Sequence, residues 1–264
     1  MNFVEMIGQP VVMAYRYAAG VIALLADTLH AVFIGPLKGK FPRIGGISEQ
    51  MVFAGIQSLV IVFFVALFTG IVIAMQSAYQ LATLGAEIYV AAMVSVGMAR
   101  ELGPVLTSLV VAGRVGAAIT AEIGSMKVSE QIEALETMAI NPVRFLVVPR
   151  FLALIFMLPC LTVLADVIGI LGGFLVGVYN LGLNPYRYMD ISFQFMVWKD
   201  VWTGLLKSFV FGMIISLIGC YMGLNTKGGA EGVGRATTVS VVTSFILIIV
   251  FDCILTAIFY FSNM

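Results

Sequence analysis

Residues 100–150 read RELGPVLTSLVVAGRVGAAITAEIGSMKVSEQIEALETMAINPVRFLVVPR, and the character of this stretch changes halfway along. Between Leu102 and Ser125 the only charged residues are Arg114 and Glu122. This first half is typical of a helix inside a bilayer, where charged side chains are rare. Charged residues return after Ser125, so the stretch predicts a membrane helix that leads into an amphipathic helix.

The amphipathic half extends from Ser125 to Pro142. Apolar residues at helical spacing form one stripe, which comprises Val128, Ile132, Leu135 and Met138. Glu130, Glu133 and Glu136 form an acidic side. Pro142 ends the helix, because proline disfavours the helical conformation of the residue before it. The pattern alone leaves two interpretations open: a helix that contacts a soluble partner, or a helix at the membrane surface without a partner.

Small residues recur every fourth position in the membrane half. One row comprises Ser108, Ala112, Gly116, Thr120 and Gly124, and a second comprises Gly113, Ala117, Ala121 and Ser125. A third row, in an earlier segment, comprises Ala66, Gly70, Ala74 and Ala78. Such rows let helices approach closely in a bilayer. We therefore expect Gly70, Ala74, Gly113 and Gly116 at contacts between helices or between two copies of the chain.

The composition is that of a multi-span membrane protein. Of the 264 residues 61% are hydrophobic and 11% are charged, whereas about 25% are charged in an ordinary soluble domain. The formal net charge is zero, which gives nucleic-acid binding no electrostatic basis. With three scattered cysteines and one histidine, the chain has no pattern of metal ligands and no nucleophile motif. We expect no metal, no cofactor and no catalytic site in this chain.

The predicted fold class is an all-α integral membrane protein, with residues 1–264 in one domain. Residues 10–35 carry Arg16, Asp27 and His30, which favours an interfacial helix over a clean span. Five spans follow within residues 51–261, at about 51–86, 89–123, 151–179, 201–224 and 239–261. The second is too long for a bilayer, and Pro104 predicts a kink that frees the carbonyl of Arg100. Residues 180–200 are expected to form a connector, and residues 225–238 a glycine-rich cytoplasmic loop.

The distribution of basic residues predicts the orientation. One set of loops holds eight of them: Lys38, Lys40, Arg43, Lys127, Arg144, Arg150, Lys227 and Arg235. The opposite set holds Arg187 and Lys199. Because positively charged loops stay in the cytoplasm, we expect the N-terminus and the amphipathic helix inside and the C-terminus outside.

Charged residues inside the predicted spans are candidates for function, because a charge in hydrocarbon is costly. They are Arg100, Glu101, Asp166, Lys207 and Asp252. For Asp166, Lys207 and Asp252 the simpler interpretation is mutual structural pairing. A proton- or ion-coupled secondary transporter would also use such groups, and this is the alternative function. It would leave the acidic amphipathic helix without a role.

Several motifs resemble the MlaE (YrbE-like) permease family of ABC lipid transporters. They are RELGP at 100–104, AGRVGAAITAEIGSMKVSEQIEAL at 112–135, INP at 140–142, PR at 149–150, GILGG at 169–173, LLKSFVFG at 205–212, RATTVSVV at 235–242 and FDCILTAIF at 251–259. The resemblance covers most of the chain after residue 50. Asp166 stands where the family pattern suggests an apolar residue, so no role is carried over to it.

The resemblance implies a homodimeric permease in the bacterial inner membrane that moves phospholipid or a related lipid between the inner and outer membranes. ATP would be hydrolysed by a separate cytoplasmic ATPase, and a ring of periplasmic MCE-domain protein would cover the outer face. The coupling helix would be residues 129–138, and its ATPase contacts would include Glu130, Gln131, Glu133, Leu135 and Glu136. The lipid cavity between the two copies would lie near Gln76, Tyr79, Arg100 and Glu101.

Overall fold

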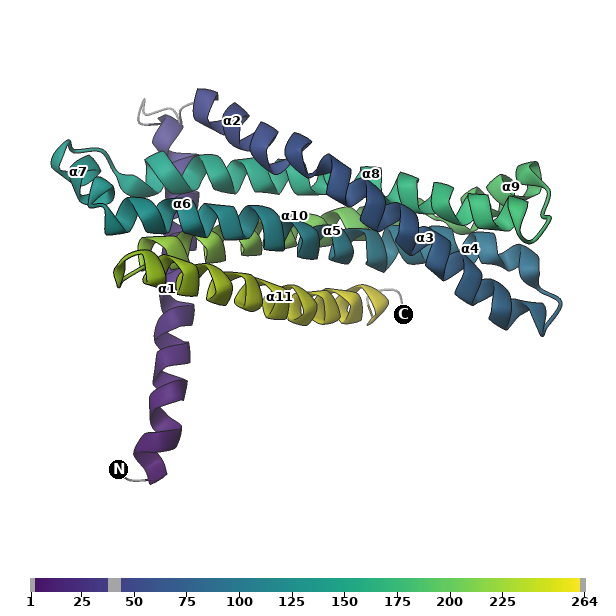
Figure 1. The fold of residues 1–264 in the computed structure, drawn as a ribbon, viewed down its shortest axis with the longest axis horizontal. Coiled ribbons are helices and arrows are strands. Elements are labelled where there is room, and N and C mark those ends of the chain that lie inside the picture. The colour runs from purple at the N-terminus through teal and green to yellow at the C-terminus, as the bar shows by residue number, and fades with distance from the viewer. Residues whose placement is uncertain (1–2, 38–43, 262–264) are drawn as a thin grey trace.

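The computed structural model describes residues 3–37 and 44–261, and every regular element in these ranges is a helix (Figure 1). Some residues on which the predicted orientation depends lie outside the described ranges, namely Lys38, Lys40, Arg43 and the C-terminal residues 262–264. The predicted all-α class is confirmed for the described part of the chain.

Long helices run side by side along the long axis of the molecule (Figure 1). They are α2–α3 (Ile44–Ala54 and Leu59–Ala82), α4–α6 (Val90–Gly97, Gly103–Val111 and Ala117–Val128), α8 (Val148–Tyr179), α10 (Trp198–Leu224) and α11 (Gly229–Phe261). The short helix α7 (Gln131–Thr137) lies at one end of this bundle, and α9 (Pro185–Phe195) lies at the other. The predicted coupling helix is therefore present, with slightly narrower bounds.

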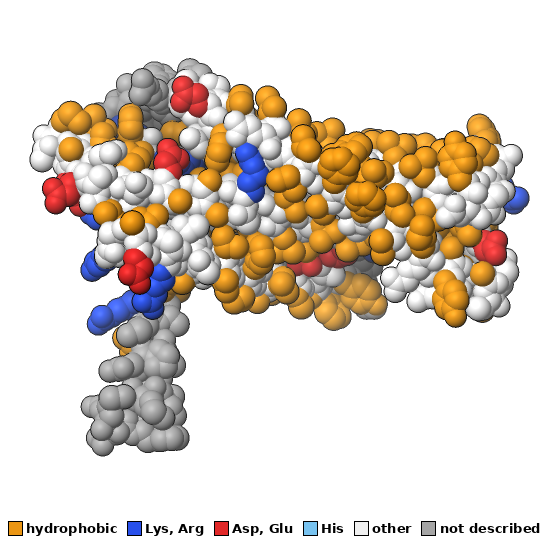
Figure 2. All heavy atoms as spheres, viewed as in Figure 1, with side chains coloured by type: hydrophobic (Ala, Val, Ile, Leu, Met, Phe, Trp, Pro, Cys, Tyr) orange, Lys and Arg blue, Asp and Glu red, His pale blue; other side chains and the backbone are white. Residues whose placement is uncertain are grey.

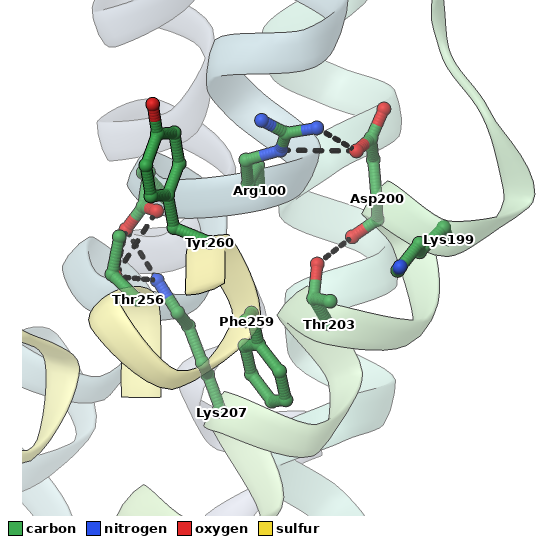
Figure 3. Close-up of a pocket in the computed structure, with 9 residues that line it drawn as sticks. Arg100, Lys199, Asp200, Thr203, Lys207, Thr256, Phe259 and Tyr260 are labelled. Carbon is green, nitrogen blue, oxygen red and sulfur yellow. Dashed lines mark hydrogen bonds and ion pairs between the residues drawn. The ribbon is translucent and has the colours of Figure 1, made fainter. Parts of the chain in front are cut away.

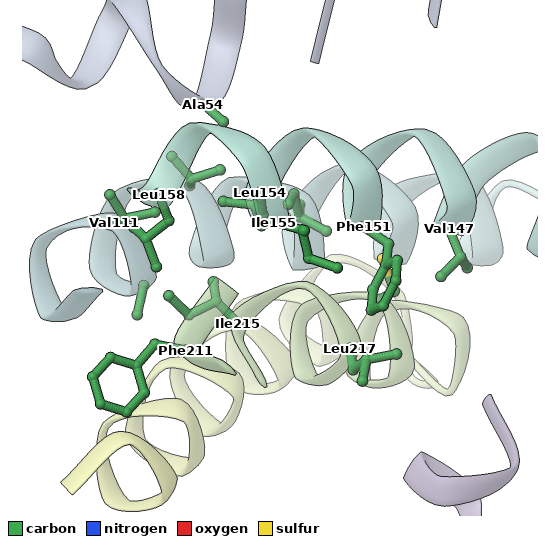
Figure 4. Close-up of a cluster of buried hydrophobic side chains, with 14 of the residues drawn as sticks. Ala54, Val111, Val147, Phe151, Leu154, Ile155, Leu158, Phe211, Ile215 and Leu217 are labelled. Atoms are coloured by element: carbon green, nitrogen blue, oxygen red, sulfur yellow. The ribbon is translucent and has the colours of Figure 1, made fainter. Parts of the chain in front are cut away.

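Helix α8 occupies the centre of the bundle, and apolar side chains pack around it (Figure 4). Phe151, Leu154 and Leu158 of α8 are buried against Phe211 and Ile215 of α10. Small residues set the distance between backbones, because a Cβ on Gly172 would overlap the carbonyl oxygen of Leu67. Close backbone approach of this kind is the packing that small residues permit in membranes.

The helix that contains Pro104 is continuous rather than broken. A π-helical turn, Met98–Leu102, directly precedes the proline, and the amide of Gly103 donates to the carbonyl of Met98. A second π-helical turn covers Ala112–Gly116. A π turn accommodates a position without an amide donor by shifting the hydrogen-bond register. The predicted kink is thus a local widening of the helix at Arg100 and Glu101.

Several predicted boundaries were wrong. The charge-free stretch 51–86 is not one helix, because a 3₁₀ turn at Ile56–Ser58 separates α2 from α3. Most of the predicted loop 225–238 is the beginning of α11, and the predicted connector 180–200 contains α9 and the start of α10. Glycine and polar residues suggested loops there, but contacts with neighbouring helices stabilise helical structure despite weak local propensity.

Helix α1 (Phe3–Leu37) crosses the α7 end of the bundle at a steep angle to the other helices (Figure 1). Its residues Val21 and Leu25 pack against the main core, and the Tyr17 ring meets the Tyr221 ring edge-on at 5.1 Å between centroids. Within residues 3–37 and 44–261, six helical stretches, including Tyr15–Phe33 of α1, are long and apolar enough to cross a membrane. The predicted count of five spans plus an interfacial helix therefore stays a prediction.

The surface of the bundle is that of a membrane protein. The most apolar 18-residue stretch of Gly229–Phe261 has a mean hydropathy of 2.6, although only 11% of that stretch is buried. Hydrophobic side chains cover most of the face in Figure 2, and charged ones gather mainly at the α7 end. Such a large exposed apolar surface requires lipid or partner chains to cover it.

The contact between α3 and α8 gives a first test. A Cβ on Gly70 would overlap the carbonyl oxygen of Gly169, whereas a Cβ on Gly113 would meet nothing closer than a Phe245 ring atom at 3.8 Å. We predict that Gly70→Ala destabilises the protein by about 1–3 kcal/mol through overpacking. Gly113→Ala is the matched control and should be neutral. Thermal unfolding in detergent measures both, and equal melting temperatures would contradict the packing described here.

Candidate functional site

Charged side chains from three parts of the chain meet where the π turn Met98–Leu102 faces α10 and α11. We call this group the buried ionic network after its buried members Asp200 and Lys207; Glu101, Asp252 and Thr256 are partly exposed and Arg100 is exposed. Figure 3 shows most of its side chains pointing toward one another around a small cavity. The network joins elements far apart in sequence, and it lies at the π turn because that turn widens the helix there.

Lys207 is the central cation of the network. Its side chain is 1% exposed, and its Nζ pairs with Glu101 and lies 2.9 Å from Asp252 Oδ1. Nζ also donates to Thr256 Oγ1 at 2.7 Å, and Thr256 donates to Glu101 at 3.2 Å. Two carboxylates around one ammonium compensate the cost of burying it. The predicted pairing of Lys207 with Asp252 is confirmed, with Glu101 as a further partner.

Arg100 has an acidic partner of its own. Its Nε donates to Asp200 Oδ1 at 3.0 Å, and one Nη donates to the same oxygen. The Asp200 side chain is 4% exposed, and its other oxygen accepts from the amide of Val197 at 3.2 Å, which caps α10. Asp200 thus both begins a helix and neutralises Arg100. Arg100 and Glu101 are neighbours in sequence but pair with different groups.

The cavity beside the network has a volume of about 80 Å³. Its lining also includes Lys199, Thr203, Phe259 and Tyr260. Pockets for drug-sized ligands measure roughly 300–1,000 Å³. One copy of the chain therefore does not enclose a phospholipid at this cavity.

The structure separates the other predicted site residues from this network. Gln76 and Tyr79 are exposed on α3, and neither lines the cavity with Arg100 and Glu101. Asp166, on α8, lies beside Gly103, and its Oδ1 is buried without a hydrogen-bond partner among the described residues. The expected pairing of Asp166 with Lys207 and Asp252 was therefore wrong. The reason is geometric, since Asp166 lies against Gly103, whereas the carboxylates that pair with Lys207 are those of Glu101 and Asp252.

Helix α7, for which a coupling role was predicted, lies between two residues with left-handed backbones, Glu130 at φ 57° and Ala139 at φ 58°. Ile132 is buried and Leu135 packs against the main core, so the apolar stripe faces inward in part. Glu130, Gln131 and Glu136 are exposed, with Val128 and Met138. The exposed side of α7 is the surface available to a partner.

Glu133 differs from the other two glutamates of α7, because it forms an ion pair with Lys127 at the end of α6. The hydrogen bond that Lys127 donates lowers the pKa of Glu133. A lowered pKa means that the stabilising effect of the pair is present near neutral pH and is lost as pH falls through that pKa. Because Glu133 is already paired within the chain, Glu130 and Glu136 present the freer negative charges.

The predicted packing residues fall into two groups. Gly70, Ala74 and Gly116 contact other helices of the same chain or are buried among them. Gly113 lies on the surface, where another molecule could approach it.

Arg150 was counted among the basic residues of the loops when the orientation was predicted. It is 4% exposed within α8, and its Nη2 lies 2.8 Å from Glu122. It therefore adds nothing to the charge of a loop.

Sequence reasoning missed Asp200 and Thr256. Asp200 lies at the end of the predicted connector, where a surface position is expected, and Thr256 lies within a predicted apolar span. One available signal was the spacing of Asp252 and Thr256, which lie one helical turn apart and so share a face of α11. No pattern within the sequence linked Asp200 to Arg100.

Taken together, the apolar bundle, the buried ionic network and the projecting helix α7 define a polytopic membrane protein of the transporter permease class. The model of the family Permease MlaE matches residues 47–258, and this chain belongs to that family.

Relatives of the chain match over most of its length. It is 41% identical over 260 residues to the Probable ABC transporter permease protein of Rickettsia typhi, covering 98% of each chain. It is 35% identical over 263 residues to the Intermembrane phospholipid transport system permease protein MlaE of Haemophilus influenzae, again covering 98% of each. It is 36% identical over 212 residues to the chloroplastic protein TRIGALACTOSYLDIACYLGLYCEROL 1 of Arabidopsis thaliana, covering 80% of this chain and 61% of that one.

The buried ionic network gives the second test. We predict that Lys207→Met lowers the free energy of unfolding by about 3 kcal/mol, because it leaves Glu101 and Asp252 facing each other without a cation. Adding Glu101→Gln and Asp252→Asn should recover much of the loss. Denaturant unfolding in detergent measures these changes, with the exposed Lys227→Met as control. If Lys207→Met were as stable as that control, the network would not hold the helices together.

Proposed function

We propose that this chain is the permease subunit of an ABC transporter that moves phospholipid between the inner and outer membranes of a bacterium. The observation that carries the proposal is the match over 98% of both chains to a permease of intermembrane phospholipid transport. The match includes the buried ionic network and α7. Under this proposal the chain has no ATPase site, and a separate cytoplasmic subunit hydrolyses ATP.

A second copy of the chain completes the lipid site in this proposal. The cavity of one copy, about 80 Å³, is too small for a phospholipid. The outward face of α3 is apolar, with Phe63, Phe64 and Phe68 each more than 40% exposed. Two such faces opposite each other would form a larger apolar cavity, with Gln76 and Tyr79 of the same helix near it. A periplasmic ring of MCE-domain protein would receive the lipid.

The orientation follows from charge. Exposed charged side chains and α7 share one end of the bundle, which we place in the cytoplasm with the ATPase. The α9 end then faces the periplasm, and α1 lies along the inner surface as a non-spanning helix. Impermeant thiol reagents test this in a cysteine-free background: Tyr186→Cys should react from outside intact spheroplasts and Thr137→Cys should not.

The proposed function predicts which molecules co-purify with the chain, namely an ATPase and phospholipid. Extracted in mild detergent with the genes around it co-expressed, the chain should carry an ATPase and about one phospholipid per dimer. Lipid extraction and phosphate analysis measure the lipid, and ATP-dependent transfer between liposomes measures the activity. Ion-driven transfer without any ATPase would instead support the secondary transporter.

Helix α7 predicts where the ATPase binds. Glu130→Lys combined with Glu136→Lys should lower co-purification of the ATPase at least tenfold, because exposed charges complementary to a partner are reversed. Asp190→Lys, an exposed acidic residue on α9 at the opposite end, is the matched control. Glu133→Lys alone should act mainly by breaking the pair with Lys127. Normal ATPase binding by the double variant would exclude α7 as the contact.

A further inference from the structure

Arg114 is partly exposed and lies at the break between α2 and α3. Its Nη1 donates to the carbonyl of Phe53 at 3.1 Å and to Ser58 Oγ at 2.7 Å, and its Nη2 donates to Gln57 Oε1 at 2.9 Å. The carbonyl groups at a helix end lack helical donors. Arg114 therefore supplies a hydrogen bond that the break at Gly55 removes from α2.

Other cations within the predicted spans are paired with carboxylates, but Arg114 has no such partner among the described residues. Arg100 pairs with Asp200, Arg150 with Glu122, and Lys207 with two carboxylates. Arg114 forms no ion pair with any acidic side chain in residues 3–37 and 44–261. The three partners just named for it are neutral, and its guanidinium carbon lies 5.3 Å from the centroid of the Phe53 ring, a contact worth far less than an ion pair.

The guanidinium also keeps unused donors. It has five N–H groups, and three of them serve Phe53, Ser58 and Gln57. The Nε–H and one Nη2–H remain without an acceptor in the described chain. Arg114 is partly exposed, Gln57 is exposed, and around them Ile56 and Val60 are 58% and 66% exposed. The result is a small cationic spot on an otherwise apolar outer face of α2–α3.

The apolar surroundings of this spot matter. Arg114 precedes the end of α6 at Val128 by 14 residues, or roughly 20 Å along the helix at 1.5 Å per residue. An unpaired charge among exposed apolar side chains such as Ile56 and Val60 costs several kcal/mol when hydrocarbon surrounds it. A ligand that supplied an anionic oxygen would remove that cost, and a planar guanidinium with two free donors suits a phosphate.

The geometry points to Arg114, with Gln57 beside it, as the site that binds the phosphate of a phospholipid whose acyl chains lie on the apolar face of α3. This inference rests on the proposed function and makes it more specific, because it assigns the phosphate contact to Arg114 and not to Arg100, which Asp200 already neutralises. Arg100 then serves to hold α10 against the π turn.

The decisive variant is Gln57→Glu, which keeps the hydrogen bond to Arg114 and adds a carboxylate that neutralises it. Arg114→Gln removes the charge but keeps a donor for the Phe53 carbonyl, and Arg114→Lys keeps the charge. Each assembled transporter would be loaded with phosphatidylglycerol or with diacylglycerol of the same acyl chains, and the retained lipid counted after detergent exchange. Thermal unfolding of each variant would be measured in parallel.

We expect Gln57→Glu and Arg114→Gln to lower phosphatidylglycerol retention about tenfold and to leave diacylglycerol retention unchanged, with Arg114→Lys between them and the wild type. A purely structural role for Arg114 predicts the opposite for Gln57→Glu, which would strengthen the contact and retain lipid normally. That result would overturn the inference, as would displacement of the lipid by millimolar inorganic phosphate. Wild-type protein that retained no phospholipid at all would instead contradict the proposed function.

Discussion

The burial of Lys207 is the constraint on which much of this architecture depends. An ammonium group that is 1% exposed within an apolar bundle requires carboxylates at contact distance. Glu101 comes from a π turn and Asp252 from the last helix, so both elements must lie against α10. A buried charge of this kind fixes the relative positions of helices that apolar packing alone would allow to slide.

The π turn links this constraint to function. Arg100 and Glu101 both lie in the π turn Met98–Leu102 and pair with different partners, although they are adjacent in sequence. The same helix continues to Arg114, whose second π turn brings it to the break between α2 and α3. Further along the chain, this helix is followed by α7, at the end of the bundle that we propose to lie in the cytoplasm. One continuous helix thus connects the ionic network to the proposed phosphate site, and a break at the left-handed Glu130 separates that helix from the proposed ATPase contact on α7.

Family membership narrows the function more than the geometry of one copy does. The intramembrane charges that suggested an ion-coupled transporter are mostly paired with one another, as a structural role requires. Asp166 is the exception, since its Oδ1 is buried without a hydrogen-bond partner in the described part of the chain. The small cavity and the large apolar surface both favour a site shared between chains over one enclosed within a single copy.

The sequence by itself determined the class, the long helices and α7, because hydropathy and helical periodicity are local properties that packing rarely reverses. It did not predict the break at Gly55, the helical start of α11 or the in-chain pairing of Glu133, since each depends on a neighbour that is not evident in the sequence. Only the tertiary structure decided which charge meets which. Arg100 and Asp200 are 100 positions apart, and Arg114 and Gln57 are 57 apart. Ion pairs depend on distance in space, which a one-dimensional pattern does not record.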